Sequence, residues 1–390
     1  MTAPALRPVH VVGVATTRFG KHLDRTLGSL TEEAVAGALA DAGLSVDAVG
    51  TAVFSNAAAG VLCGQEMIRG QVALKGTGLA GIPVVNTENA CASGGSAVHL
   101  AWLAVASGQV DTAISVGAEK LFHPDKARSF AAIESGTDLS LQREGETVTG
   151  GSVMMGAYAA QARAYAAEHG DIADALAAVA VKNRTFASGN PDAQFRDPVS
   201  IDDVAASRPV ADPLRLLTCS PLTDGAAAVV LTARDGASTG DVSIATTTMV
   251  SHRSGSSVVR RAADQAYSAT GLTAADIDVF ALHDACAFAE LVQYEQVGLV
   301  PVGQGADAAR DGRTGPGGTA PVNTDGGLLS RGHALGATGV AQIVELTRQL
   351  RGSAGQRQVP DARRALAVNS GGWMGDDYAT SVATLLTGVA

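Results

Sequence analysis

A strand–helix–strand order that occurs twice in this sequence restricts its fold more than any other feature. Each copy has an apolar stretch of strand length, then an amphipathic stretch, then a second short apolar stretch. The expected strand, helix and strand are residues 9–14, 30–44 and 49–54 in the first half, and 242–250, 258–272 and 279–282 in the second. A duplicated order of this kind predicts an α/β protein with two sheets and with helices packed between and around them.

One short match between the two halves supports the duplication, and the stretch between them suggests how the chain is divided. The expected helix of each half ends in Gly-Leu and is followed by serine or threonine, at residues 43–45 and 271–273. The stretch between the halves, with an expected helix at 155–169 and a polar loop at 187–198, fits neither copy. We therefore expect two halves and a loop segment that covers a cleft. The predicted bounds are 1–121 with 221–240 for the N-terminal half, 122–220 for the covering segment and 241–390 for the C-terminal half.

Cys91 lies where an apolar strand, residues 82–85, is expected to turn into a helix that is apolar on all sides, residues 97–106. At the start of a helix, unpaired backbone N–H groups and the helix dipole favour a negative charge. A thiol there gains thiolate character, and the thiolate is the nucleophilic form. Residues 92–95 are all small, so a substrate carbonyl could approach the backbone closely. Cys91 is therefore a candidate nucleophile, with an inert buried cysteine as the alternative.

His333 lies in a glycine-rich turn, residues 323–339, that leads into an amphipathic run at 340–350. A histidine in such a turn has little side-chain crowding around it and can reach into a cleft. A neutral imidazole is also the commonest general base in proteins. The sequence therefore predicts that His333 is the base that activates Cys91.

The two segments that hold Cys91 and His333 resemble motifs of the thiolase family. Residues 88–94 (Glu-Asn-Ala-Cys-Ala-Ser-Gly) match its E-N-x-C-A-S-G motif, and residues 323–339 match N-x-x-G-G-x-x-x-x-G-H-P-x-G-A-T-G, with Ala334 in place of proline. Further stretches are similar to the sterol-carrier-protein branch of the family, namely residues 65–74, 182–184, 190–196, 211–214 and 224–228. The resemblance implies a duplicated, five-layered α-β-α-β-α fold with an inserted loop domain.

A third motif, residues 283–291, is similar to the H-D-C-F-x-x-x-E-L segment of that branch. The resemblance implies that His283 helps to bind the carbonyl oxygen of the second substrate and that the motif's cysteine exchanges a substrate proton. Here Ala285 stands at the cysteine position and Cys286 follows it. On a helix, a shift of one residue turns a side chain by about 100°. Cys286 is therefore either a relocated acid or base, or a packing residue of a helix expected at 285–297.

A fourth motif, residues 368–375, corresponds to the C-x-G-G-G-x-G turn of ordinary thiolases, with Asn369 at the position of their second cysteine. An amide cannot act as an acid or a base near neutral pH. The backbone N–H of Gly371 could form an oxyanion hole with that of Cys91, although a tight turn would also require a glycine there. Two candidate acids have no motif position, Tyr294 and Tyr378.

The resemblance implies that His333 takes the proton from Cys91 and that the thiolate attacks an acyl thioester to form an acyl-enzyme. Either coenzyme A or a carbanion then takes the acyl group. The function implied is that of a 3-ketoacyl-CoA thiolase or acetyl-CoA acetyltransferase, with a coenzyme A thioester as substrate and no tightly bound cofactor. Ala285 and Asn369 remove the usual second base. An acyltransferase that acts on a secondary-metabolite acceptor, which supplies its own nucleophile, is therefore the main alternative.

Two other classes of protein stay open from the sequence. A retro-aldol lyase working with a small OB-fold partner protein is known among thiolase-like proteins, but it needs no acyl-enzyme. A non-catalytic thiolase-like subunit would be expected to lose its nucleophile. The presence of both Cys91 and His333 disfavours both classes. The resemblance also implies at least a homodimer, in which the apolar strand at 82–85 would continue a sheet across a two-fold axis.

Composition disfavours several further classes. The 390 residues are 46% hydrophobic and 17% charged, which allows a large core and more than one domain. A net charge of −10 gives no basic surface for nucleic acid. No stretch has the length and apolarity of a membrane span, and residues 1–23 lack the features of a signal peptide, so we expect a cytoplasmic protein. The cysteines have no paired spacing, which disfavours disulfides and a metal site: Cys63, Cys91, Cys219 and Cys286.

Overall fold

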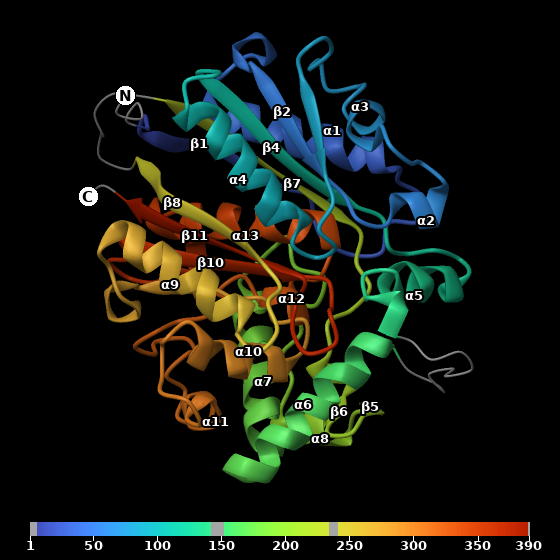
Figure 1. The fold of residues 1–390 in the computed structure, drawn as a ribbon, viewed down its shortest axis with the longest axis vertical. Coiled ribbons are helices and arrows are strands. Elements are labelled where there is room, and N and C mark those ends of the chain that lie inside the picture. The colour runs from blue at the N-terminus through green and yellow to red at the C-terminus, as the bar shows by residue number, and fades with distance from the viewer. Residues whose placement is uncertain (1–5, 142–151, 234–240, 389–390) are drawn as a thin grey trace.

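The central feature of the fold is one nine-stranded mixed sheet (Figure 1). The computed structural model describes residues 6–141, 152–233 and 241–388. Across the sheet the strand order is β3-β2-β4-β7-β1-β8-β11-β10-β9, and a separate hairpin pairs β5 with β6. The strands are β1 (Val9–Thr16), β2 (Thr51–Ser55), β3 (Val84–Thr87), β4 (Thr112–Glu119), β5 (Pro209–Ala211), β6 (Leu214–Arg215), β7 (Gly225–Ala233), β8 (Val242–Ser251), β9 (Val279–Ala281), β10 (Arg364–Gly371) and β11 (Thr380–Gly388).

Helices fill the space between the two halves of this sheet and cover its outer faces. They are α1 (Leu27–Ala42), α2 (Ala59–Cys63), α3 (Arg69–Ala73), α4 (Ser93–Ala106), α5 (Lys126–Glu134), α6 (Val153–His169), α7 (Ala173–Ser188), α8 (Ile201–Ala206), α9 (Val258–Thr270), α10 (Ala287–Gln296), α11 (Gly305–Arg310), α12 (Gly327–Ser330) and α13 (Leu335–Leu350). α4 and α13 pack against each other and against strands of both halves, whereas α1 covers the first half and α9 the second. The layers are therefore helix, strand, helix, strand, helix, which confirms the predicted α/β architecture.

The predicted duplication is present in the order of the elements. β1, α1 and β2 form one copy, and β8, α9 and β9 form the other. The two expected sheets are nevertheless continuous, because β1 pairs with β8 at His10–Ser243 and Val11–Val242. α1 begins at Leu27 rather than at residue 30, since the Thr26 side chain accepts the N–H of Ser29 and caps the helix.

The two central helices meet near their N-terminal ends, where there is no room for side chains. A Cβ atom on Gly339 would lie 2.2 Å from the backbone nitrogen of Gly95, and one on Gly94 would lie 2.8 Å from the backbone nitrogen of Gly339. Only glycines allow so close an approach of two backbones. Because Cys91 precedes α4 and His333 precedes α13, this contact brings the two candidate catalytic residues to the same place.

A long segment between β4 and β7 holds α5 to α8 and the small hairpin, drawn in green in the lower part of Figure 1. Within it, α6 matches the helix expected at 155–169, and α7 packs against α10, α11 and α12. The division into two halves and a covering segment stays a prediction. Residues 1–5, 142–151, 234–240 and 389–390 of these predicted units lie outside the described residues. In the described ranges, no helix combines the length and the apolarity needed to cross a membrane.

Candidate active site

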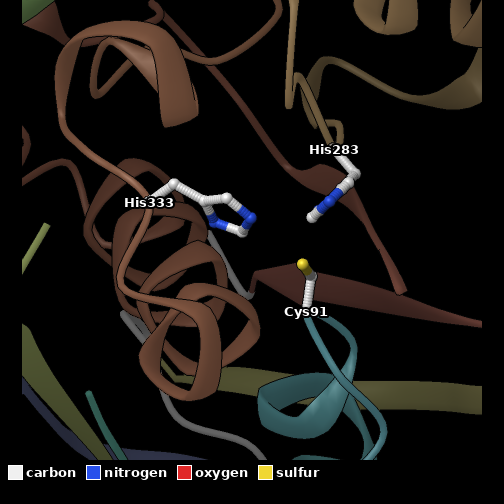
Figure 2. Close-up of side chains that lie close together, drawn as sticks. All are labelled: Cys91, His283 and His333. Carbon is white, nitrogen blue, oxygen red and sulfur yellow. The ribbon is translucent and has the colours of Figure 1, made fainter. Parts of the chain in front are cut away.

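Cys91 sits in a tight turn between β3 and α4. Ala90, directly before it, has a φ of 47°, in the left-handed region that residues with a side chain rarely adopt. The Ser93 side chain holds this turn, since its oxygen accepts the N–H of Asn89 at 2.8 Å and donates to the carbonyl of Ala90 at 2.6 Å. The turn directs the thiol toward the two histidines, as Figure 2 shows.

His283 and His333 lie beside Cys91, so the three residues form one cluster (Figure 2). The Cys91 sulfur and one ring nitrogen of each histidine lie within 4.8 Å of one another. The ring centroids of the histidines are 5.2 Å apart and the rings are nearly perpendicular, at 76°. His283 follows β9 and His333 precedes α13, so residues far apart in the sequence meet at one end of the central helices. The structure thus brings together the three side chains that the motifs predicted.

The Cys91 thiol is protonated in the resting site. Burial raises the pKa of Cys91 to about 12, and the Glu119 carboxylate adds to the rise. A backbone hydrogen bond lowers the pKa, as the position near the start of a helix predicted, but its effect is smaller than that of burial. The expected thiolate is therefore not the resting form, and a base must remove the proton before Cys91 can attack.

His333 has the tautomer that such a base requires. Its Nδ1 lies 2.8 Å from the Thr338 hydroxyl, and that hydroxyl donates to the carbonyl of Ala334 at 3.1 Å. The hydrogen between the ring and Thr338 must therefore come from Nδ1, which leaves Nε2 with its lone pair. Nε2 is buried and has no hydrogen-bond partner among the described residues. Burial holds the pKa of His333 well below its usual value, and electrostatic repulsion from His283, were it protonated, and from Arg331 acts in the same direction, so the ring is neutral.

Asn369 and Gly371 lie at the end of β10, directly against the turn that holds Cys91. A Cβ atom on Gly371 would lie 2.7 Å from the backbone nitrogen of Cys91 and 2.2 Å from that of Ala92. Glycine is therefore required for the close approach of the two backbones, whatever its chemical role. The oxyanion hole formed by the N–H groups of Cys91 and Gly371 stays a prediction.

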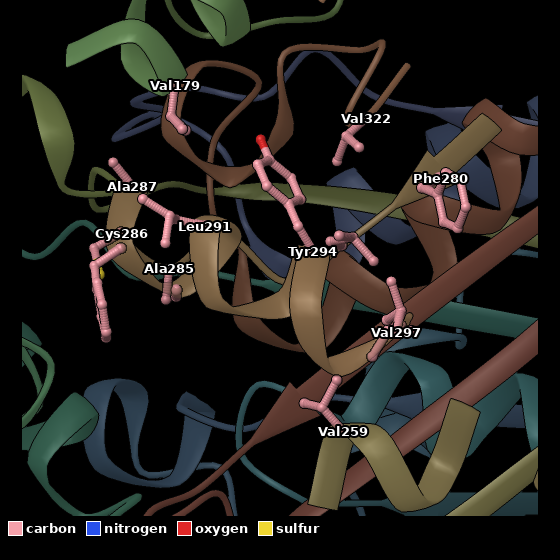
Figure 3. Close-up of a cluster of buried hydrophobic side chains, with 14 of the residues drawn as sticks. Val179, Val259, Phe280, Ala285, Cys286, Ala287, Leu291, Tyr294, Val297 and Val322 are labelled. Atoms are coloured by element: carbon pink, nitrogen blue, oxygen red, sulfur yellow. The ribbon is translucent and has the colours of Figure 1, made fainter. Parts of the chain in front are cut away.

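Cys286 lies behind the wall of the site. It stands at the N-cap position of α10 without a side-chain capping hydrogen bond, is fully buried, and packs in the apolar cluster drawn in Figure 3. Ala285, not Cys286, lines the cavity beside the catalytic cluster. The expected helix at 285–297 begins only at Ala287, so the rotation argued from helical geometry does not apply. The catalytic role of Cys286 stays a prediction, and its position favours packing.

A cavity of about 860 Å³ opens in front of Cys91, His283 and His333. Most of its wall is apolar, and much of this surface comes from the segment between β4 and β7: Phe130, Ile133, Met154, Met155 and Leu216. The Tyr378 and Tyr158 rings also line it, and the Tyr158 hydroxyl donates to that of Tyr378 at 3.0 Å. Tyr294 does not reach the cavity, since its hydroxyl donates to Glu290 in the core.

Cys219 and Glu119 are among the residues in or near the site that were not singled out from the sequence. Cys219 lines the cavity, and its backbone pairs with that of Cys286. Glu119 is fully buried and accepts N–H groups from Ala57, at 2.9 Å, and Gly336, at 3.1 Å. It thereby ties the loop after β2 to the start of α13. No motif identified either residue, because both act through contacts between segments that are distant in the sequence.

Comparison with known proteins agrees with this geometry. The model of the thiolase N-terminal domain matches residues 9–235, and that of the thiolase C-terminal domain-like family matches residues 242–384. An acetyl-CoA acetyltransferase of Methanothermobacter thermautotrophicus is 38% identical over 379 residues, which cover 94% of this chain and 97% of the relative. Sterol carrier protein 2 of Homo sapiens is 36% identical, over 94% of this chain and 70% of its own length. A solved structure titled Ltp2-ChsH2(DUF35) aldolase has a TM-score of 0.79 at 24% identity, covers 98% of both chains, and supports the fold alone.

Proposed function

Since this chain belongs to the thiolase family and is a thiolase-type acyltransferase, we propose that Cys91 carries the acyl group of a coenzyme A thioester as a covalent acyl-enzyme. The observation that carries the proposal is the cluster of Cys91, His283 and His333, in which Nε2 of His333 has no hydrogen-bond partner among the residues that the structure describes. Nε2 takes the thiol proton, and the sulfur then attacks a carbonyl carbon of the donor, the 3-keto carbon in cleavage or the thioester carbon in synthesis. The N–H groups of Cys91 and Gly371 stabilise the oxyanion, and a thiol or a carbon nucleophile accepts the acyl group.

The reaction we propose is the cleavage or formation of 3-ketoacyl-CoA thioesters. The large, mainly apolar cavity fits a donor with a bulky acyl chain better than an acetyl group alone. The test is a series of 3-ketoacyl-CoA donors of increasing size, each incubated with free coenzyme A. We expect release of a shortened acyl-CoA, with kcat/KM rising as the chain fills the cavity. The absence of cleavage for every donor that does acylate Cys91 would contradict the thiolase reaction.

That same outcome would favour the second candidate, acyl transfer to an acceptor that brings its own nucleophile. The observation behind this candidate is the lack of a thiol at two positions, where Ala285 lines the cavity and Asn369 donates to the carbonyl of Cys91. Retro-aldol cleavage with an OB-fold partner needs no acyl-enzyme, and a non-catalytic subunit needs no nucleophile. The cluster around Cys91 therefore gives neither of these two alternatives support.

We propose a homodimer that forms along β3. This strand is the edge of the nine-stranded sheet, and Val85 on it is 45% exposed. Light scattering at micromolar concentration should give twice the mass of the chain, and Val85→Lys should shift the protein toward the monomer. Met249→Lys is the matched control, because Met249 is a similarly exposed apolar residue on β8, away from this edge. A wild-type monomer would contradict the homodimer. The small OB-fold partner protein would then be the next candidate to test for binding at the β3 edge.

The variant Cys286→Ala distinguishes the two roles considered for Cys286, a relocated acid or base and a packing residue. Because the thiol is buried behind Ala285, we expect acylation and carbon–carbon cleavage to persist. The loss of one buried sulfur should lower the free energy of unfolding by roughly 1 kcal/mol, measured by denaturant titration. Normal acylation with no cleavage would instead show that Cys286 is the relocated acid or base.

A further inference from the structure

The cluster of Cys91, His283 and His333 holds two histidines, and the contact of Asn369 with His283 makes their hydrogen-bonding roles different. We propose that Nε2 of His333 moves every proton of the reaction, and that Asn369 is a positioning residue that holds His283 as an N–H donor. The inference rests on the proposed acyl-enzyme function. It extends that function, because it assigns opposite tautomers to the two histidines.

The amide of Asn369 is fixed in one orientation. Its oxygen accepts the backbone N–H of Gly95 at 2.9 Å, and its nitrogen donates to the carbonyl of Cys91 at 3.0 Å. A flipped amide would lose both hydrogen bonds and place an N–H against the N–H of Gly95. The Asn369 nitrogen therefore faces Nδ1 of His283, 3.4 Å away, with its second hydrogen.

The tautomer of His283 follows from this contact. An N–H that points at Nδ1 requires a lone pair there, so the hydrogen of the neutral ring is on Nε2. The ring is neutral because burial, with the nearby charge of Arg331, lowers the pKa of His283 to about 3. His283 thus offers an N–H to an oxygen in the cavity that it lines, and it has no lone pair there with which to take a proton. His333 has the reverse arrangement, with a hydrogen on Nδ1 and a lone pair on Nε2.

Other ionisable groups of the cavity are poorly placed to share the proton transfers. Cys286 lies behind the wall. Cys219 does line the cavity, but in the described part of the chain it is not in the cluster that Cys91, His283 and His333 form, and burial raises the pKa of Cys219 to about 12. The carboxylates are held by other partners, Glu88 by Arg69 and Asp138 by Ser140. The tyrosine hydroxyls are bonded to each other, and burial raises the pKa of both: Tyr158 and Tyr378.

One base is sufficient for thiolysis of a 3-ketoacyl-CoA. His333 takes the proton of the Cys91 thiol, the sulfur bonds to the keto carbon, and the bond between that carbon and the α-carbon breaks. The departing enolate takes the proton from His333, which gives acetyl-CoA. His333 then takes the thiol proton of a coenzyme A, whose sulfur bonds to the acyl carbon as the bond to Cys91 breaks. The proton returns to Cys91, so atoms and charges balance with no second base.

The tautomers can be read directly in the resting protein, without turnover. Ring ¹⁵N chemical shifts should show the hydrogen on Nε2 in His283 and on Nδ1 in His333. In Asn369→Asp, an isosteric change, the carboxylate should draw a hydrogen to Nδ1 of His283, and the His333 signals should stay unchanged. A wild-type His283 with its hydrogen on Nδ1 would overturn the assignment. This measurement is independent of whether an acyl-enzyme forms, so its failure is distinguishable from failure of the proposed function.

The proposal that His333 is the single base is tested on deacylation, the transfer of the acyl group from Cys91 to coenzyme A. Enzyme acylated by prolonged incubation is freed of donor and mixed with coenzyme A, and loss of the acyl mass is followed in time. We expect His333→Gln to slow deacylation on the order of 10² to 10⁴-fold, as for loss of a general base. Cys219→Ala and Cys286→Ala should deacylate at close to the wild-type rate. If either cysteine variant acylates normally but deacylates more slowly by about tenfold or more, a thiol is the second base and the proposal is wrong.

Discussion

Replacement of Cys91 by alanine should abolish acyl transfer while leaving the fold intact. Alanine fits among the small residues of this turn, and the strained Ala90 and the bonds of Ser93 do not involve the thiol. Loss of the nucleophile costs on the order of 10⁶ in rate in a comparable acyl-transfer triad, so we expect turnover at the limit of detection. The measurement is the initial rate of acyl-CoA release, with the unfolding midpoint taken in parallel.

Cys63→Ala is the matched control for this change. Cys63 ends α2, is exposed, and does not line the cavity, so its loss should leave the rate and the acyl adduct unchanged. If Cys91→Ala kept turnover while Cys63→Ala reduced it, the nucleophile would have been assigned to the wrong cysteine.

His333→Gln should lower the rate of acylation by about 10² to 10⁴-fold and change donor binding little, because a general base acts in the transition state. Glutamine keeps a polar side chain beside Thr338 but has no basic nitrogen. Stopped-flow acylation, measured over a range of donor concentrations, separates the rate constant from the dissociation constant. His22→Gln is the control, since His22 lies outside the cavity. Acylation at the wild-type rate would remove His333 from the mechanism.

The pH dependence of acylation follows from the same residue. The pKa of His333 is lowered by burial, so the ring stays neutral and able to accept a proton as the pH falls through about 6.5, the usual pKa of histidine. We therefore expect the acid limb of the acylation rate to lie well below that pH. An acid limb centred on the usual histidine pKa would contradict a buried, neutral base.

The residues of the site could be predicted largely because they occupy turns with strong local signals. Cys91 and His333 each stand in a run of small residues before a helix, and the glycines at the starts of α4 and α13 are what allow those helices to touch. The duplicated order of apolar segments likewise predicted the layers, since strand and helix periodicity are local properties. These predictions needed only the sequence around each residue.

What could not be predicted depends on contacts between distant segments. The join of the two halves of the sheet depends on a pairing of β1 with β8, which no local pattern encodes. The place of Cys286 depends on where α10 begins, and element boundaries are set by tertiary packing. The protonated state of Cys91 reflects burial by several chain segments together, and this outweighs the favourable helix start. The tautomers of the two histidines also required their partners, Thr338 and Asn369, to be located.

The mass of the intact protein, after brief incubation with an acyl-CoA donor and removal of the excess, shows whether Cys91 carries the acyl group. The proposed mechanism predicts one added acyl group per chain, located on the peptide that contains Cys91, and its loss when coenzyme A is added. Cys91→Ala should show no added mass with the same donor. Turnover without an adduct in the wild-type protein, or an adduct on another residue that is released to coenzyme A, would show that Cys91 does not carry the acyl group.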